Sequence, residues 1–189
     1  MFLLRKPSAE QIERFISSQC ELPFSYPEVG ATRDTLPRGY AIDHNRVKVG
    51  AGRQTFARAV QALETWKQFD LGWVKIVPVK TRPEIGSTVA IRARTFGFWS
   101  LSACRVIYAI NEGGPIKKFG FAYGTLPDHV ERGEERFTVE WHTGDDSVWY
   151  DILAFSRPHH PLVKFAFPLA RLLQKRFARE SLRQMTQLM

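Results

Sequence analysis

The chain has 189 residues and a formal net charge of +8, with 44% hydrophobic and 13% aromatic residues. This composition provides enough apolar side chains for a large core and excludes an intrinsically disordered chain. No run approaches the roughly 20 apolar residues of a membrane span and no signal-peptide core is present, so we expect a soluble, cytoplasmic protein with a basic surface that favours acidic partners.

The first 43 residues are predicted to form a short helix followed by an extended arm. Ser8 and Gln11 have the spacing of a capping box, and Ile12, Phe15 and Ile16 then mark one face of a helix over 9–19. Residues 21–43 contain three prolines and two glycines, which is typical of an extended segment with turns.

The middle of the chain is predicted to contain one helix and a series of strands. A strand over 44–49 precedes a helix over 53–68, in which the apolar residues recur at helical spacing. From residue 72 onward the apolar residues alternate, and turns rich in Gly, Pro or Asp separate the segments. This pattern predicts strands at 72–77, 87–94, 102–110, 117–125, 134–142 and 147–156. Because short turns join sequential strands, an antiparallel meander is favoured.

A long amphipathic helix is predicted over 160–186. Pro161 suits its first turn, whereas Pro168 is expected to kink or divide it, because proline clashes with the preceding turn and donates no hydrogen bond. One face is apolar, and six cations against one acid, Glu180, occupy most of the rest. The helix is long enough to cover the apolar face of an open sheet.

The predicted fold class is therefore α+β, with an antiparallel sheet of about six to seven strands curved around the C-terminal helix. We expect a single domain over 1–189, in which 1–43 form the N-terminal helix and arm and 44–189 form the core. This order of elements resembles the helix-grip fold of the START and Bet v 1-like superfamily. The resemblance implies an apolar or amphipathic ligand held between sheet and helix.

Three stretches of the chain carry a more specific resemblance. They are YPEVGATRDTLPRGY at 26–40, VGAGRQTFARA at 49–59 and FAYGTLPDHVERGEERF at 121–137. These stretches resemble the uncharacterised protein family 0548, and the match runs over nearly the whole chain. Because that family has no established activity, the resemblance implies a fold and assigns no catalytic residue.

The segment from Tyr123 to Glu135 is the richest in polar chemistry. If it folds over the mouth of a pocket, His129 and Glu131 are expected to form the polar edge of that pocket. The alternative is a solvated connection with charges at its tip. Phe121 and Trp141, on the apolar faces of their predicted strands, are expected in the wall of the pocket.

Three polar residues within predicted strands are candidate anchors for the polar group of a ligand: Tyr123, Arg105 and Asp151. Each contacts a ligand only if it lies on the concave face of the sheet. Asp151 shares one face of its predicted strand with Trp149 and Leu153, so this carboxylate is expected either to contact a ligand or to form a buried ion pair with an arginine.

Three functions remain open at this point. A binding module for a small apolar or amphipathic ligand is favoured, and an enzyme would use His129 with Glu131 or Glu134 as acid and base. An anionic membrane is the alternative partner, through the basic final helix. No cofactor and no metal site is expected, because no known ligand spacing is present. Nucleic acid is not an expected partner, because the chain has no RRM, KH or helix-turn-helix signature.

Overall fold

The structure is a computed structural model that describes residues 1–159 and 167–189. Eight strands, three α-helices and one 3₁₀ turn follow one another along the described chain. In order they are β1 (Phe2–Leu3), α1 (Ala9–Gln19), β2 (Ala41–Ala51), α2 (Gly52–Glu64), the 3₁₀ turn η1 (Lys67–Phe69), β3 (Val74–Val77), β4 (Thr88–Thr95), β5 (Phe98–Glu112), β6 (Ile116–Thr125), β7 (Glu131–His142), β8 (Ser147–Pro158) and α4 (Phe167–Gln187).

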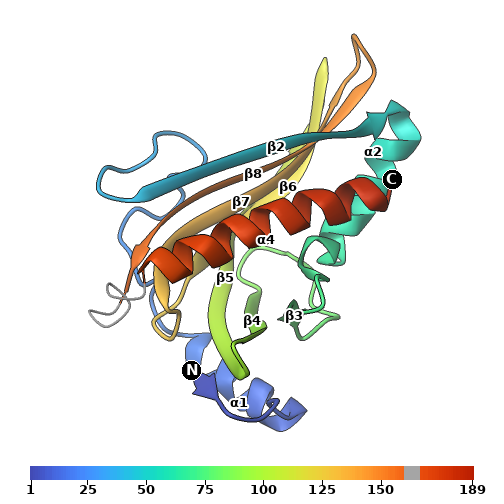
Figure 1. Cartoon of the computed structure of the whole chain (residues 1–189). Coiled ribbons are helices and arrows are strands. Elements are labelled where there is room, and N and C mark those ends of the chain that lie inside the picture. Colours follow the sequence, from blue (N-terminus) through green and yellow to red (C-terminus); the bar gives the residue numbers. More distant parts are fainter. Residues whose placement is uncertain (160–166) are drawn as a thin grey trace.

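The strands form one antiparallel sheet in the order β2-β8-β7-β6-β5-β4-β3, with β1 paired to β5. The strands from β3 to β8 are adjacent in both sequence and space, as expected for a meander, and β2 joins the free edge of β8. Figure 1 shows α4 crossing one face of the curved sheet. The predicted α+β architecture, a sheet curved around the C-terminal helix, is confirmed.

Several predicted boundaries were wrong. Strand β2 begins at Ala41, three residues before the predicted start, and β7 begins at Glu131 instead of residue 134. Helix α2 ends at Glu64, because Trp66 adopts the left-handed conformation with φ of 56° and starts the 3₁₀ turn. The two-residue strand β1 was not predicted, since two residues carry no periodic pattern.

Part of the predicted C-terminal helix, residues 160–166 with Pro161, lies outside the described residues. From Phe167 onward the predicted helix is present as α4. Pro168 is its second described residue, so the remainder of the described helix contains no proline. None of the helices in the described ranges is long and apolar enough to cross a bilayer.

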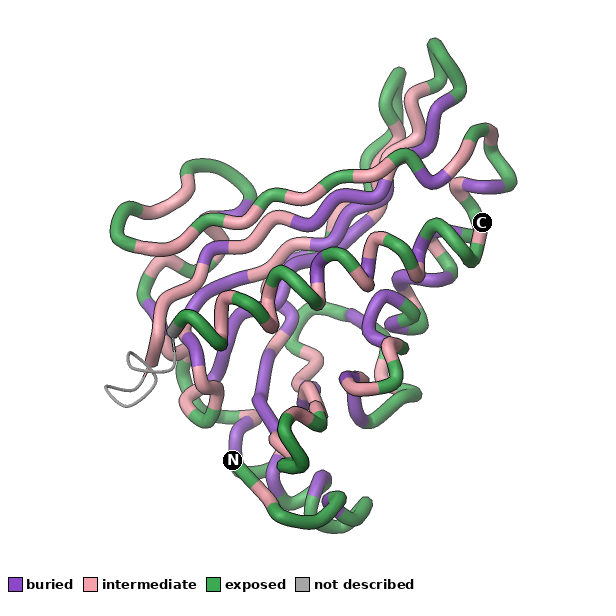
Figure 2. Tube along the Cα trace, in the orientation of Figure 1, coloured by how far each residue is buried: buried purple, intermediate pink, exposed green. Residues whose placement is uncertain are grey.

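The two faces of the sheet are covered by different parts of the chain. Helices α2 and α4 pack on the concave face, over a core that includes Phe69, Phe121 and Phe137. Helix α1 and the N-terminal arm pack on the convex face, where a Cβ at Gly124 would lie 2.3 Å from Tyr26 Oη. Figure 2 shows buried residues along the strands behind α4, whereas exposed and intermediate residues alternate along most of α4 itself, with a few buried ones among them.

Candidate ligand-binding site

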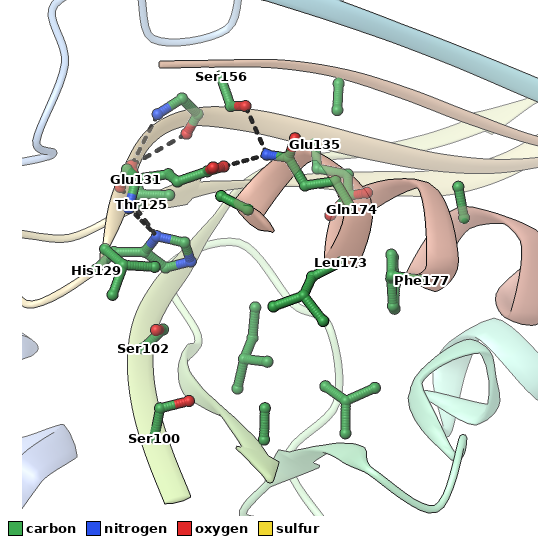
Figure 3. A pocket seen from close by; sticks show the side chains of 18 of the residues that line it. Ser100, Ser102, Thr125, His129, Glu131, Glu135, Ser156, Leu173, Gln174 and Phe177 are labelled. Carbon is green, nitrogen blue, oxygen red and sulfur yellow. Dashed lines mark hydrogen bonds between the residues drawn. The ribbon is translucent and has the colours of Figure 1, made fainter. Parts of the chain in front are cut away.

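A cavity of about 490 Å³ lies between α4 and the concave face of the sheet. Small-molecule sites typically enclose roughly 300–1,000 Å³, so this volume suits a metabolite-sized ligand. The apolar wall comes mainly from α4, β4 and the segment around β3, with Leu173, Phe177, Ile91, Ala93 and Trp73 among its side chains. Figure 3 shows Leu173 and Phe177 projecting from α4 into the cavity.

The acidic side chains and the imidazole of the cavity gather around the start of β7, whereas Ser100 and Ser102 line it with hydroxyl groups from β5. Glu131, Gly133 and Glu135 share the inner face of β7, because alternate residues of a strand point to the same side. His129 precedes them in the turn after β6, and Gln174 faces them from α4. Figure 3 shows that these polar groups lie to one side of Leu173 and Phe177. The cavity therefore has an apolar body and one polar end.

The imidazole of His129 is held by the backbone of Glu131. Its Nδ1 lies 3.0 Å from the backbone nitrogen and 2.9 Å from the carbonyl oxygen of Glu131, so it accepts from the N–H group when unprotonated and donates to the carbonyl when protonated. Burial lowers the pKa of His129 to about 4, and the ring is therefore neutral near pH 7. Within the described part of the chain, Nε2 makes no hydrogen bond. His129 thus offers the cavity a ring nitrogen that donates in one tautomer and accepts in the other.

Glu131 is only 8% exposed and has one carboxylate oxygen without a partner. Its Oε2 accepts a hydrogen bond from Gln174 Nε2, which also donates to Ser156 Oγ at 2.9 Å. Its Oε1 is buried and has no hydrogen-bond partner among the described residues. Burial raises the pKa of this carboxyl group. Buried acceptors are normally hydrogen-bonded, so we expect a bound molecule or water to donate a hydrogen bond to Oε1.

Glu135 is the most strongly perturbed carboxyl group of the cavity. Its Oε2 accepts a hydrogen bond from Tyr123 Oη at 2.6 Å, and within the described ranges its Oε1 accepts none. Burial raises its pKa to about 7; the hydrogen bond from Tyr123 opposes the shift, and the negative charges of Asp43 and Glu131 add to it. Near neutral pH the group is therefore divided between its charged and neutral forms.

An ion pair joins α4 to the edge strand β2 beside the cavity. Arg171 binds both carboxylate oxygens of Asp43, with 2.6 Å between Nη2 and Oδ1. Arg171 Nη1 also donates to Gln174 Oε1 at 2.6 Å, which leaves Gln174 Nε2 to face Glu131. The charge of Asp43 is therefore already compensated by a cation, and the side chain of Gln174 is fixed.

Of the seven residues predicted from the sequence, the structure brings Tyr123, His129 and Glu131 together around the cavity. Phe121 is fully buried in the core beside Trp66 and does not line the cavity. Trp141 lies near the far end of β7, where its Nε1 donates to Asp146 Oδ1 at 2.7 Å. Both residues face inward as expected, but neither reaches the cavity.

Arg105 does not line the cavity either. Its guanidinium donates to backbone carbonyls at and just after the end of α1, including those of Gln19 at 3.1 Å and Leu22 at 3.0 Å. It also donates to the carbonyl of Cys20 and packs against the ring of Phe24. Arg105 thus satisfies carbonyl groups at the C-terminal end of α1 on the convex side of the sheet.

Asp151 also lies on the convex face, because it alternates with the core residues Tyr150 and Ile152. Its carboxylate is 2.6 Å from His44 Nε2 and 3.4 Å from Arg136 Nη2. Of the two roles expected for Asp151, the structure therefore contains the ion pair and no contact with the cavity.

Glu134 has its carboxylate directed away from His129 and Glu131. It accepts hydrogen bonds from Tyr26 Oη at 2.9 Å and from the backbone N–H groups of Gly30 and Thr32 at 2.7 and 3.0 Å. The carboxylate therefore holds the N-terminal arm on the convex face. The three residues expected to act as acid and base do not form one group.

Sequence reasoning did not select Glu135, Asp43 or Gln174 for the site. The signal for Glu135 was present, since the alternation of β7 placed it with Phe137 and Val139 on the apolar face. A carboxylate on a face that is otherwise apolar is a candidate functional group, because its burial needs compensation.

Comparison with known proteins places the chain among uncharacterised relatives. Residues 25–184 match the family described as Domain of unknown function (DUF1990). The chain is 37% identical over 204 residues to a UPF0548 protein of Dictyostelium discoideum, covering 98% of this chain and 94% of that protein. It is 32% identical over 190 residues to a UPF0548 protein of Arabidopsis thaliana, covering 93% and 91%.

Among solved structures, the chain is similar to a hypothetical protein from Helicobacter pylori, with 15% identity, a TM-score of 0.50 and coverage of 85% of this chain and 94% of that chain. It is also similar to a START superfamily protein from Mycobacterium smegmatis, with 19% identity, a TM-score of 0.47 and coverage of 80% and 100%. At these identities the first similarity concerns the fold alone.

Proposed function

We propose that this chain, which belongs to the DUF1990 (UPF0548) family, binds a small apolar or amphipathic molecule between the sheet and α4. The observation that carries the proposal is the cavity of about 490 Å³, with apolar walls and one polar end. Burial of apolar ligand surface contributes about 25 cal/mol per Å², so most of the affinity comes from the walls. The polar end then orients the ligand.

Native mass spectrometry of the purified protein, followed by denaturing extraction, tests this function directly. We expect an apolar molecule to be retained, or the unfolding midpoint to rise with an apolar molecule from a lipid and metabolite panel. A ligand that binds only the folded state must stabilise it. A protein that retains nothing and is stabilised by no compound of the panel would contradict the proposal.

Filling the cavity is expected to abolish binding while the fold is retained. Ala93 lines the cavity from β4, and an indole ring at this position occupies the space intended for the ligand. We expect Ala93→Trp to reduce affinity at least about tenfold, which corresponds to 1.4 kcal/mol. Ala57, exposed on α2 and outside the cavity lining, provides the control substitution Ala57→Trp, which should leave binding unchanged. Titration calorimetry with a retained ligand measures both, and equal affinities for the two variants would count against this site.

A second candidate function, contact with an anionic membrane, is favoured by the rim of the cavity. Three aromatic rings on this rim are largely exposed: Phe2 (68%), Phe96 (68%) and Phe98 (51%). On the other wall of the cavity, α4 exposes Leu172 and a row of cations at helical spacing, namely Arg176, Arg179 and Arg183. Exposed rings at the rim and cations on α4 suit an interface with acidic lipid head groups, from which an apolar ligand can enter the cavity.

Co-sedimentation with vesicles containing about one-third phosphatidylserine tests the membrane contact. The double variant Phe96→Ser/Phe98→Ser is expected to bind at least about threefold more weakly than the unchanged protein, because insertion of the rings is lost. The matched control is Val79→Ser/Ile85→Ser, whose side chains are 65% and 68% exposed but do not line the cavity. Equal loss in both variants, or no binding by the unchanged protein at low salt, would exclude this surface.

A further inference from the structure

The charge of the cavity is opposite to the charge of the protein. The chain carries 27 lysines and arginines against 19 acidic residues, for a net charge of +8. Within the described chain, the residues that line the cavity include no lysine or arginine, but they include four acids: Asp43, Glu131, Glu134 and Glu135. The cavity is therefore an acidic site inside a basic protein.

Two of these acids have both carboxylate oxygens bound, and two have one oxygen free. Asp43 is bound by Arg171, and Glu134 is bound by the N-terminal arm. Glu131 and Glu135 each have one oxygen without a hydrogen-bond donor among residues 1–159 and 167–189. Only Gly133 lies between them on the inner face of β7, so no side chain of that strand stands between the two carboxyl groups.

We infer that the ligand is an amphipathic amine, whose protonated nitrogen binds Glu135 while its apolar part contacts Leu173 and Phe177. This inference rests on the binding function proposed above and specifies its ligand class. An ammonium group supplies the hydrogen-bond donors that the free carboxylate oxygens lack, in bonds strengthened by both charges. Glu131 is the second acceptor at the same end of the cavity. The free Nε2 of His129 suits a hydroxyl substituent on the ligand, which can both donate and accept.

Other head groups fit the polar end less well. A carboxylate or phosphate brings further acceptors and negative charge to a site that already has both, and no lysine or arginine of the described lining compensates them. A neutral alcohol satisfies one acceptor but compensates no charge. Long-range attraction does not explain a preference for amines either, because the net charge of the protein repels a cation.

The pH dependence of binding follows from the groups packed around Glu135. These are Tyr123 from β6, Glu131 from β7, Asp43 from β2, Cys104 from β5 and Tyr150 from β8. Arg171 of α4 is bound to Asp43, and His129 lines the same cavity from the turn. An aliphatic amine keeps its proton over the neutral range and binds the ionised form of Glu135, which predominates above about pH 7. Amine binding is therefore strengthened as the pH rises through 7, whereas carboxylate binding is weakened.

Three compounds with the same apolar chain separate the head groups: decylamine, decanol and decanoate. Their affinities are measured by displacement of the uncharged fluorescent probe N-phenyl-1-naphthylamine at about pH 8 and about pH 5.5. At the higher pH we expect decylamine to bind about tenfold more tightly than decanol, and decanoate to bind most weakly. At the lower pH the preference for the amine should decrease to about threefold or less.

Variants assign the preference to Glu135. Glu135→Gln should abolish the preference for decylamine over decanol and leave decanol affinity within about twofold. The control Glu112→Gln removes an equal charge at an exposed position of β5 and should retain the preference. If the probe and decanol bind but decylamine has no advantage, the amine inference is wrong and the binding function stands. If neither the probe nor any of the three compounds binds, the binding function itself fails.

Discussion

Replacement of Glu134 by alanine is expected to lower the free energy of unfolding by about 3 kcal/mol. The carboxylate is 2% exposed and accepts hydrogen bonds from the hydroxyl groups of Tyr26 and Thr32 and from the N–H groups of Gly30 and Thr32. Hydrogen bonds to a charged group contribute more than neutral ones, and removal of the shared acceptor leaves several donors unsatisfied. The N-terminal arm then keeps its aromatic contacts and its other hydrogen bonds to the sheet, which include those of Ser25 with Thr125 and of Thr32 with Tyr108.

Urea denaturation measures the loss, and limited proteolysis locates it. We expect cleavage between residues 26 and 40 to be faster in Glu134→Ala, because the backbone of this segment loses its anchor. The control Glu112→Ala changes an exposed carboxylate and should stay within about 0.5 kcal/mol of the unchanged protein. A loss below about 1 kcal/mol in Glu134→Ala would show that the arm is held by other contacts.

Replacement of the neighbouring residue, Glu135, by glutamine is expected to have the opposite effect and to stabilise the protein above pH 7. Burial raises the pKa of Glu135 from its ordinary value of 4.5 to about 7. The folded state therefore binds a proton more tightly than the unfolded state, so stability is highest below pH 4.5 and decreases as the pH rises to 7. Each unit of pKa difference between the folded and unfolded states corresponds to 1.36 kcal/mol. The Glu135→Gln protein should therefore be about 3 kcal/mol more stable than the unchanged protein at pH 8.

Chemical denaturation of both proteins at pH 8 and at pH 4 tests this expectation. At the lower pH, Glu135 is protonated in both states, so the difference should fall below about 0.5 kcal/mol. His129 has the opposite dependence, because its lowered pKa contributes stability above pH 6.5 that is lost as the pH falls to about 4. This contribution is common to both proteins and cancels in the difference. A Glu135→Gln variant no more stable at pH 8 would mean that the buried charge is compensated.

The contrast between Glu134 and Glu135 shows what the sequence can predict. The alternation of β7 assigns the two residues to opposite faces without any structure, since Phe137 and Val139 identify the apolar face. The same alternation, together with the turns, predicts the strands of the meander and the need for a covering helix. These features depend on neighbouring residues and were therefore confirmed.

The remaining features depend on contacts between distant residues. Alternation groups Asp151 with Trp149, but it does not identify their face as the one opposite α4. Trp141 has the correct face, yet its distance from the cavity is set by how far α4 and the polar turn lie along the sheet. The pair of Asp43 and Arg171 joins residues 128 positions apart, and no local pattern relates them. The predicted residues that line the cavity therefore all belong to one segment, from Tyr123 to Glu135.

The two kinds of cavity wall come from separate parts of the chain. The acidic groups with free oxygens lie at the start of β7, whereas the apolar side chains belong mainly to α4, β4 and the segment around β3. Substitutions in α4 or β4 can therefore change the length and shape of the accepted molecule without altering the recognition of its head group. Related proteins with this fold can diverge in ligand size through a few residues such as Ala93 or Leu173 while the chemistry at β7 stays the same.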